Sequence, residues 1–217
     1  MAEQIEEVLR QFGVLKEGHF RLASGLHSGQ YFEKFRILEH PDLVTQFAGR
    51  IAETYRDKGV TIVCGPTTGG VIIAFEVARQ IKARCVVAEK NEPSGRKIGR
   101  GFQFAPEDRI LVVDDVLTTG GSVNDTLAAL RAFPGTVVGI AVLIDRSATP
   151  DDDPSHRVGR VQPPQARGAG HGPGGPFPMP HFAVYRRAVQ NFPPDNCPLC
   201  AQGIPLVAPG STKTPKP

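Results

Sequence analysis

Two adjacent carboxylates followed by a run of hydroxyls and glycines form the segment of this chain best suited to chemistry. Asp114 and Asp115 end an apolar run, and the glycine- and hydroxyl-rich residues 118–122 come soon after them. A glycine-containing turn before a helix offers backbone N–H groups and hydroxyls to a phosphate. Carboxylates beside such a turn suit the hydroxyl donors of a ribose diol, or a magnesium ion. The segment therefore predicts a ligand with a phosphate, a sugar diol and a metal ion; the alternative is a strand-turn-helix with two solvated aspartates.

The elements that position these groups follow from the apolar pattern in the middle of the chain. Short apolar runs alternate there with helix-like segments, which predicts a mostly parallel sheet covered by helices on both faces. In open sheets of this kind, ligands bind at the carboxyl ends of the strands. The two aspartates are therefore expected at the ligand-binding edge. The predicted strands are 60–64, 84–90, 110–115 and 136–144.

Several segments lie outside this alternation. The N-terminal part is predicted to form a helix over 3–12, a strand-turn-strand over 18–38 that covers a site, and a second helix over 41–58. Residues 181–187 are predicted to add one more strand. The proline- and glycine-rich segment 148–180 has few large apolar side chains, so burial cannot offset its ordering entropy. We interpret it as a flexible surface insertion.

The segment 110–123 resembles the phosphoribosyl pyrophosphate signature of the type I phosphoribosyltransferases. The resemblance implies their α/β fold, a central, mostly parallel sheet flanked by helices, with a small N-terminal hood. It implies that Asp114 and Asp115 contact the ribose hydroxyls and that residues 118–122 bind the 5′-phosphate. The residues expected to bind phosphoribosyl pyrophosphate are Lys90, Asp114, Asp115, Val116, Leu117, Thr118, Thr119, Gly120, Gly121 and Ser122.

Further segments narrow the resemblance to the orotate phosphoribosyltransferases. Residues 18–28, followed by Tyr31 and Phe32, resemble the N-terminal hood of that family. Residues 65–70 resemble its pyrophosphate-binding loop, and residues 196–206 are similar to the C-terminal tail of one bacterial and archaeal subgroup. The resemblance covers all of the chain except the insertion and the extreme tail.

The same resemblance identifies residues for orotate itself. Arg146 follows a predicted strand at the position whose arginine pairs with the carboxylate of orotate, and a planar guanidinium matches a carboxylate bidentately. Orotate is therefore expected to bind to Thr118 and Arg146. Ala23 and Gly69 depart from the family, because many of its members carry a lysine at these positions. Both departures remove positive charge near the anionic ligands.

The polar segment 89–101 stands where the family has a mobile catalytic loop. Its Lys90, Arg96, Lys97 and Arg100 can neutralise pyrophosphate as it departs. In the family this loop reaches into the neighbouring subunit, so the resemblance implies a homodimer with shared active sites. A solvated basic hairpin is the alternative interpretation. The predicted catalytic residues are Lys90, Arg96, Lys97, Asp114 and Asp115.

Composition excludes several classes of protein. The chain has 217 residues, 40% hydrophobic and 22% charged, which is typical of one soluble domain with a core of its own. Its net charge of +3, without a basic run or a helix-turn-helix pattern, argues against a nucleic-acid partner. No run of 18 apolar residues and no signal peptide is found, so we expect no membrane partner and a cytoplasmic location.

Cysteines and histidines receive no assigned ligand role from the sequence, and no metal-ligating residue is predicted. Cys197 and Cys200 form a C-x-x-C without a second close pair, so we interpret them as structural or incidental thiols, with metal or redox roles as alternatives. His27 lies in the hood and either approaches the substrate or bonds to a turn. His19 and His40 are expected at the surface or as capping residues.

These observations predict one domain, 1–217, with a hood from about 1–40 and the C-terminal segment, a core of about 41–147 and the insertion 148–180. The predicted reaction uses Mg²⁺ and transfers the phosphoribosyl group of phosphoribosyl pyrophosphate to orotate. Its products are orotidine 5′-phosphate and pyrophosphate, in pyrimidine (UMP) biosynthesis. Two alternatives are a type I phosphoribosyltransferase for a purine base and a non-catalytic regulator that senses phosphoribosyl pyrophosphate.

Overall fold

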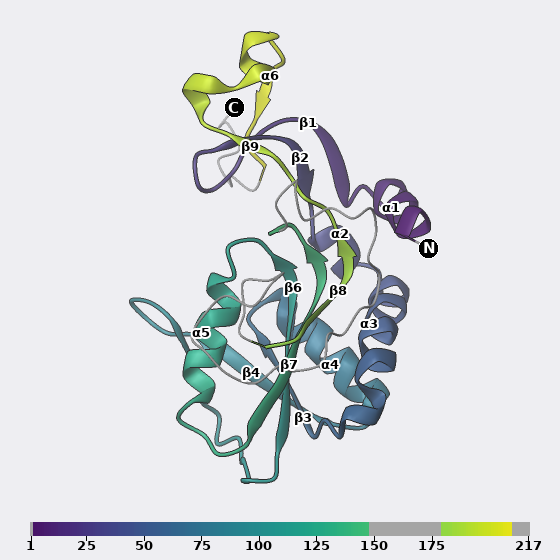
Figure 1. Ribbon diagram of the computed structural model, residues 1–217, viewed down its shortest axis with the longest axis vertical. Helices are drawn as coiled ribbons and strands as arrows, with labels where there is room; N and C mark the ends of the chain where they lie inside the picture. The colour runs from purple at the N-terminus through teal and green to yellow at the C-terminus, as the bar shows by residue number, and fades with distance from the viewer. Residues whose placement is uncertain (1, 148–178, 210–217) are drawn as a thin grey trace, which may run out of the picture.

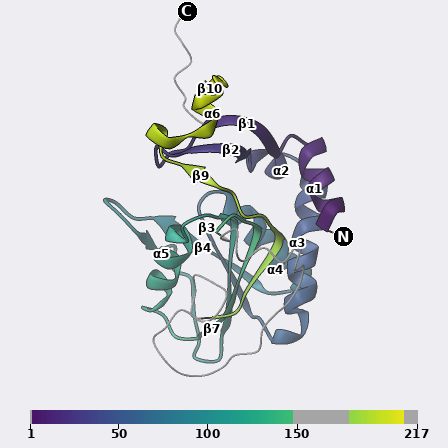
Figure 2. The ribbon, with the colours of Figure 1, turned by 45° about the horizontal axis from the view of Figure 1, so that its top comes forward.

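The computed structural model describes residues 2–147 and 179–209. Their strands form two sheets, one of six strands and one of four. The six-stranded sheet and its helices make the body of the molecule, and the four-stranded sheet lies over one end of it (Figures 1 and 2). We call this smaller sheet, with the turns and short helices between its strands, the hood.

The six-stranded sheet is parallel except at one edge. Its strand order is β5-β4-β3-β6-β7-β8, and only β5 runs antiparallel to its neighbour. Parallel neighbours need crossover connections, and helices supply those between β3 and β4 and between β6 and β7. The strands are β3 (Ile62–Pro66), β4 (Arg84–Lys90), β5 (Arg96–Lys97), β6 (Arg109–Leu117), β7 (Thr136–Asp145) and β8 (His181–Arg186).

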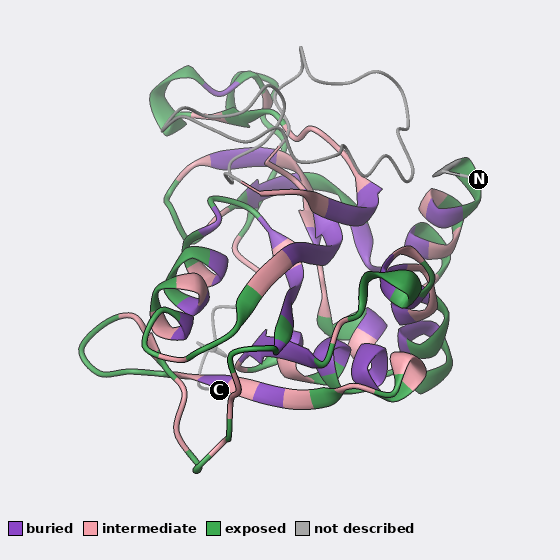
Figure 3. Cartoon of the chain, turned by 60° about the horizontal axis from the view of Figure 1, so that its bottom comes forward, coloured by how far each residue is buried: buried purple, intermediate pink, exposed green. Residues whose placement is uncertain are grey.

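Helices cover both faces of this sheet. α3 (Pro41–Tyr55) and α4 (Gly69–Ile81) pack on one face, and α5 (Gly121–Leu130) packs on the other (Figure 1). Successive strand residues point to opposite faces, so Val63 joins the apolar cluster under α3 and α4 whereas Ile62 joins the cluster under α5. Burial is concentrated on the strands and on the helix faces turned toward them (Figure 3). Burial from both sides explains the continuous apolar runs of the sequence.

Both ends of the chain build the hood. β1 (Leu15–Arg21) and β2 (His27–Phe32) form an antiparallel hairpin. The C-terminal segment adds β9 (Asn191–Phe192) beside β2 and β10 (Leu206–Val207) beside β1, so the strand order is β10-β1-β2-β9. The remaining elements are α1 (Ala2–Gln11), α2 (Phe35–Leu38), the 3-10 turn η1 (Arg56–Lys58), the 3-10 turn η3 (Pro194–Asn196) and α6 (Pro198–Ala201).

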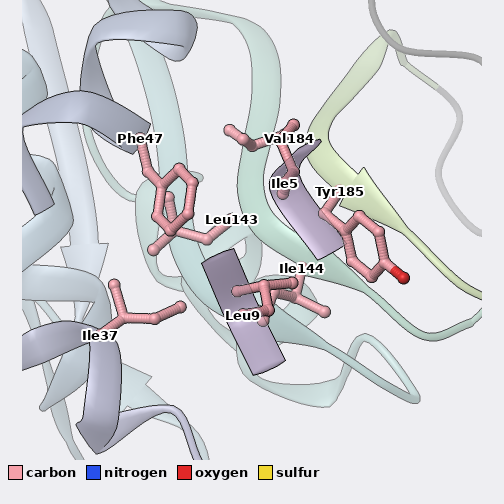
Figure 4. A pocket seen from close by; sticks show the side chains of 8 residues that line it. All are labelled: Ile5, Leu9, Ile37, Phe47, Leu143, Ile144, Val184 and Tyr185. Carbon is pink, nitrogen blue, oxygen red and sulfur yellow. The ribbon is translucent and has the colours of Figure 1, made fainter. Parts of the chain in front are cut away.

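The N-terminal helix α1 is attached to the body by an apolar face. Its Ile5 and Leu9 point toward side chains of α2, α3, β7 and β8 (Figure 4). The Tyr185 hydroxyl donates a 2.6 Å hydrogen bond to Glu6 at the margin of this contact. We interpret this contact as helix-to-sheet packing, because its lining is almost wholly apolar and leaves no room for a water molecule. The lining residues are Ile5, Leu9, Ile37, Phe47, Leu143, Ile144, Val184 and Tyr185.

The predicted α/β fold with its hood is confirmed, and some details differ. The strand predicted over 60–64 begins at Ile62 and ends at Pro66. The prediction of a surface or capping position for His19 is wrong: the side chain is buried, because Ile204 and the rest of the C-terminal segment close over it. The interpretation of 148–180 as flexible falls almost entirely outside the described residues. Among the described helices, none combines the length and the hydropathy that crossing a membrane requires.

Candidate active site at the carboxyl ends of β3 and β6

The candidate site lies between β3 and β6, the two neighbouring strands from which the chain continues toward opposite edges of the six-stranded sheet. From β3 the chain crosses to β4 on one side, and from β6 it crosses to β7 on the other. Ligands of open α/β sheets bind beyond the carboxyl ends of the strands at such a switch point. The residues that follow β3 and β6, 67–70 and 118–122, lie at this edge.

Asp114 and Asp115 lie near the carboxyl end of β6 and are almost fully buried. The backbone N–H of Asp115 donates to Asp114 Oδ1 at 2.8 Å, and the backbone N–H of Val116 donates to Asp115 Oδ1 at 2.7 Å. Lys34, which follows β2 of the hood, places its Nζ 2.9 Å from Asp115 Oδ2. Two buried carboxylates therefore share one ion-paired lysine, and that lysine comes from the hood.

The charge balance differs between the two carboxylates. Burial, followed by repulsion from Asp115, raises the pKa of Asp114 to about 7. Hydrogen bonds donated to a carboxylate favour its ionised form, so a ligand with hydroxyl donors would lower this pKa again. A sugar diol has such donors, whereas a phosphate at the same place would be repelled by the charged pair. The pair is therefore suited to a diol.

Two glycines at the start of α4 bring the backbone directly against this pair. A Cβ on Gly69 would overlap Asp115 Oδ2, and a Cβ on Gly70 would lie 3.0 Å from Asp114 Oδ1 and 2.6 Å from Pro66 Cδ. A side chain at position 69 would thus need the space that the Asp115 carboxylate occupies. Glycine at position 69 therefore leaves room for the Asp115 carboxylate.

Arg96 connects the two loops that border the site. Its guanidinium donates to Ser122 Oγ at 2.8 Å, to the backbone oxygen of Thr67 at 3.2 Å and to the backbone oxygen of Ala88 at 3.0 Å. The contact to Thr67 reaches the loop after β3, and the contact to Ser122 reaches the first turn of α5. Arg96 therefore holds the two loops at a fixed separation, which makes it a positioning residue in this arrangement.

Arg146 directly follows β7 and is anchored beside the turn of residues 118–122, which we call the phosphate-type turn. Its backbone N–H donates to the backbone oxygen of Leu117 at 2.9 Å, and its guanidinium lies 5.4 Å from the centre of the Phe32 ring. Burial lowers the pKa of this arginine, and its Nε has no hydrogen-bond partner among the described residues. A half-buried guanidinium with a free donor is suited to a carboxylate ligand.

The other predicted residues occupy varied positions around this edge. Thr118 and Thr119 are exposed, and Gly120 adopts a left-handed backbone conformation with φ of 77° as the N-cap of α5. The side chain of Leu117 is buried in one apolar cluster, and the partly buried side chain of Val116 packs against the other. The geometry does not test the assigned roles, which stay predictions.

The cations of the β4–β5 hairpin differ in their exposure and in their salt bridges. Lys90 and Lys97 are exposed and form no salt bridge with another described residue, whereas Arg100 is paired with Glu89 at 2.7 Å. β5 lies beside α5, so the exposed lysines are carried near the phosphate-type turn. Lys34 was missed in the sequence analysis. The only available signal was its place just after the hood strand that ends in Tyr31 and Phe32.

Comparison with known proteins identifies the family of the chain. The model of the phosphoribosyl transferase domain family matches residues 36–164. The orotate phosphoribosyltransferase of Caldanaerobacter subterraneus subsp. tengcongensis is 35% identical over 211 residues, which cover 97% of this chain and 98% of that protein. The orotate phosphoribosyltransferase of Pelotomaculum thermopropionicum is 36% identical, with the same coverage of both chains.

A solved structure gives the same indication. The crystal structure of orotate phosphoribosyltransferase from Aeropyrum pernix aligns with a TM-score of 0.57 and 27% identity. The alignment covers 65% of this chain and 81% of the other. The sequence relatives and this structure thus agree on one family.

Proposed function

The chain belongs to the orotate phosphoribosyltransferase family, and on this basis we propose that it transfers the phosphoribosyl group of phosphoribosyl pyrophosphate to orotate. The bond from the anomeric carbon to pyrophosphate breaks, and a bond from that carbon to an orotate nitrogen forms. The products are orotidine 5′-phosphate and pyrophosphate, so the reaction belongs to pyrimidine nucleotide synthesis. The observation that carries the proposal is the buried Asp114–Asp115 pair, which lies against the Gly69–Gly70 backbone and just before the turn 118–122, with Arg146 bonded to the backbone of Leu117.

The ribose and its phosphate are assigned to β6 and the turn after it. Asp114 and Asp115 accept hydrogen bonds from the ribose hydroxyls. Ionised carboxylates have acceptors and no donors, so they suit the hydroxyl donors of a sugar. Residues 118–122 bind the 5′-phosphate through hydroxyls and backbone N–H groups at the start of α5. The left-handed Gly120 permits the tight turn that aims these groups.

Catalysis in this proposal rests on positioning and charge. Glycosyl transfer passes through a transition state with positive charge on the sugar ring, and no covalent nucleophile is required here. Negative charge from Asp114 and Asp115 near the ribose favours that transition state, while cations favour the departing pyrophosphate. Lys90 and Lys97 are the exposed cations of the β4–β5 hairpin and are assigned to pyrophosphate. Arg96 is assigned to hold the loops that surround both groups.

Magnesium fits this set of donors. Mg²⁺ is usually held by one or two carboxylates together with substrate phosphates, and the site offers two adjacent carboxylates beside a phosphate-type turn. Asp114 and Asp115 are the residues that would face it, directly or through the ribose hydroxyls. When bound, the ion neutralises charge on the pyrophosphate as the bond to the sugar breaks.

Orotate is assigned to the space between the hood and the end of β7. Arg146 pairs with its carboxylate, and the Phe32 ring that lies near this guanidinium belongs to the hood strand β2. A purine base has no carboxylate for Arg146, and the relatives do not favour that alternative. We further propose a cytoplasmic homodimer in which the exposed β4–β5 hairpin reaches the site of the second subunit.

The test of this assignment is the double variant Asp114→Asn/Asp115→Asn, with the exposed Asp125→Asn on α5 as the matched control. We expect the double variant to lose about 10²- to 10⁴-fold in kcat/KM for phosphoribosyl pyrophosphate, because charge near the developing cation is removed. Asp125→Asn should remain within about twofold of the wild type, because its side chain is exposed. Full turnover and an unchanged KM in the double variant would contradict the assignment.

A further inference from the structure

Four potential metal ligands converge in the hood, away from the carboxylates of the candidate active site. His19 lies on β1, His27 begins β2, and Cys197 and Cys200 flank the start of α6. One ligand atom from each residue lies within 4.8 Å of all the others. Three of the four side chains are buried, and both thiols are free. The two histidines therefore supply the second pair of ligands, which the sequence alone did not reveal.

The separations between these atoms match the edges of a tetrahedron around one ion. His19 Nε2 lies 3.0 Å from His27 Nδ1, 3.6 Å from Cys197 Sγ and 3.7 Å from Cys200 Sγ. Cys200 Sγ lies 3.3 Å from His27 Nδ1. Tetrahedral Zn²⁺, with bonds of about 2.0–2.1 Å to nitrogen and about 2.3 Å to sulfur, requires edges of roughly 3.3 Å between nitrogens and 3.6 Å between nitrogen and sulfur.

We propose that His19, His27, Cys197 and Cys200 bind a structural Zn²⁺ ion. Two thiolates and two imidazoles in tetrahedral geometry select zinc over hard ions such as Mg²⁺, which prefer oxygen ligands. All four positions are filled by protein, as in a structural site, whereas a catalytic zinc keeps one position for water or substrate. This ion is therefore separate from the magnesium of the proposed reaction.

The surroundings of His19 support the assignment. Its Nδ1 lies 2.8 Å from the backbone oxygen of Ile204, so Nδ1 carries the proton and donates it there. This tautomer leaves a lone pair on Nε2, the atom that faces His27 and both sulfurs. Metal-bound histidines commonly donate their second ring nitrogen to a backbone carbonyl in this way, which fixes the ring orientation.

The C-terminal segment has little else to hold it in place. Within 193–207, Cys197 is the only residue that is buried, and Leu206 and Val207 of β10 are about half exposed. β9 and β10 are two residues long, and each pairs with the hood hairpin at only two positions. A metal contributes folding free energy where burial of apolar surface is small.

The site also connects the C-terminal segment to the strand that approaches the substrates. β2 begins at His27 and ends at Phe32, and Lys34 follows two residues later. Phe32 lies near the Arg146 guanidinium, and Lys34 is paired with Asp115. Zinc at one end of β2 would thus fix the register of the strand whose other end contacts the candidate active site. α6 lies beside this hairpin in both ribbon views (Figures 1 and 2).

The first experiment measures zinc by mass spectrometry in purified full-length protein, after Zn²⁺ addition and removal of the excess by gel filtration. We expect about one zinc per chain in the wild type and in Cys85→Ala, whose thiol lies in β4 outside the cluster. Cys197→Ser/Cys200→Ser should retain only background zinc, because two of the four ligands are lost. Equal zinc in this variant and the wild type would overturn the proposal.

The second experiment needs no variant, so it remains decisive if the substitutions prevent folding. The wild-type apoprotein is titrated with Co²⁺, which should give the intense visible bands of tetrahedral coordination and a thiolate charge-transfer band at one ion per chain. Added Zn²⁺ should then displace Co²⁺ and abolish these bands. Weak octahedral bands, no binding, or the loss of two titratable thiols to a Cys197–Cys200 disulfide would each overturn the proposal. Neither experiment depends on turnover, so failure here leaves the proposed reaction untouched.

Discussion

Lys34 Nζ lies 2.9 Å from Asp115 Oδ2, so an ion pair joins the hood to a buried carboxylate of the body. Asp115 is 4% exposed, and its second oxygen already accepts the backbone N–H of Val116. The lysine side chain keeps about 40% of its surface exposed. One flexible cation from the hood therefore compensates a carboxylate that water scarcely reaches, which links the position of the hood to the charge of the site.

Replacing Lys34 by methionine tests this link. Asp115 would remain as a buried anion beside Asp114 without its cation, so we expect the variant to lose on the order of 1–3 kcal/mol in the free energy of unfolding at pH 8. Urea denaturation measures this loss, and Lys16→Met, an exposed lysine of β1, is the control. Equal stability of Lys34→Met and Lys16→Met would show that the ion pair contributes nothing to folding.

Asp114 should make the stability of the protein depend on pH. Its pKa rises from 3.8 to about 7 on folding, through burial and then the charge of Asp115. The folded protein therefore keeps a proton that the unfolded chain releases between about pH 4 and pH 7, and the free energy of unfolding falls as pH rises through this window. Asp114→Asn cannot ionise, so it should be more stable than the wild type at pH 8, by on the order of 1–3 kcal/mol.

That difference should shrink as the pH approaches 4, where the carboxyl is protonated in both states. Thermal unfolding of Asp114→Asn and of the exposed Asp125→Asn across this range supplies the comparison. A stability difference for Asp114→Asn that stays constant from pH 4 to pH 8 would contradict the raised pKa.

Gly69→Ala should be far more damaging than its size suggests. The added Cβ would overlap Asp115 Oδ2, so either the start of α4 or the carboxylate must move. We expect a loss of about 1–3 kcal/mol in stability and at least about a tenfold loss in kcat/KM. Gly29→Ala in β2 is the matched control, because its Cβ would meet its nearest neighbour at an ordinary 3.8 Å. Wild-type kinetics in Gly69→Ala would show that the close approach to Asp115 has no role in the reaction.

Arg96 and Lys97 are adjacent in sequence but should respond differently to substitution. Arg96 donates to both loops of the site, so Arg96→Ala should lower both stability, by roughly 1–3 kcal/mol, and kcat/KM. Lys97 is exposed and without a salt bridge among the described residues. Lys97→Ala should lower kcat by about tenfold or more and leave the unfolding free energy within about 0.5 kcal/mol. If both variants lose stability equally, the distinction between a positioning residue and a catalytic one is wrong.

Arg146→Ala should separate base recognition from the sugar site. Loss of a charge-assisted bidentate pair should raise KM for orotate by about 30- to 1,000-fold, while KM for phosphoribosyl pyrophosphate changes little. Arg146→Lys should recover only part of the affinity, because an ammonium lacks the planar fork. An unchanged KM for orotate in Arg146→Ala would place the orotate carboxylate elsewhere.

The features of the fold that depend on local sequence pattern could be predicted from the sequence. Apolar runs such as Ile110 to Val113 predicted buried strands, and the switch from apolar residues to Asp114 and Asp115 predicted the carboxyl end of β6. These features depend on residues close together in the chain. Periodicity and turn chemistry are sufficient to read them.

The features that were missed depend on contacts between distant segments. The Lys34–Asp115 pair spans the hood and β6, and neither residue signals the other in the sequence. The burial of His19 depends on Ile204, which lies 185 residues further along the chain. The C-x-x-C and the two histidines eight residues apart come together as one cluster only when β10 pairs with β1 and β9 pairs with β2. Tertiary pairing of this kind has no local periodic signature.

Orotate consumption by the purified wild-type protein with phosphoribosyl pyrophosphate, followed in the ultraviolet, tests the proposed reaction most directly. We predict loss of orotate with release of one pyrophosphate per orotate, dependent on Mg²⁺ and abolished by EDTA. Turnover with a purine base but none with orotate would contradict the assignment of Arg146 and of the base while leaving the sugar site intact. Binding of phosphoribosyl pyrophosphate without turnover of any base would contradict the proposed reaction itself.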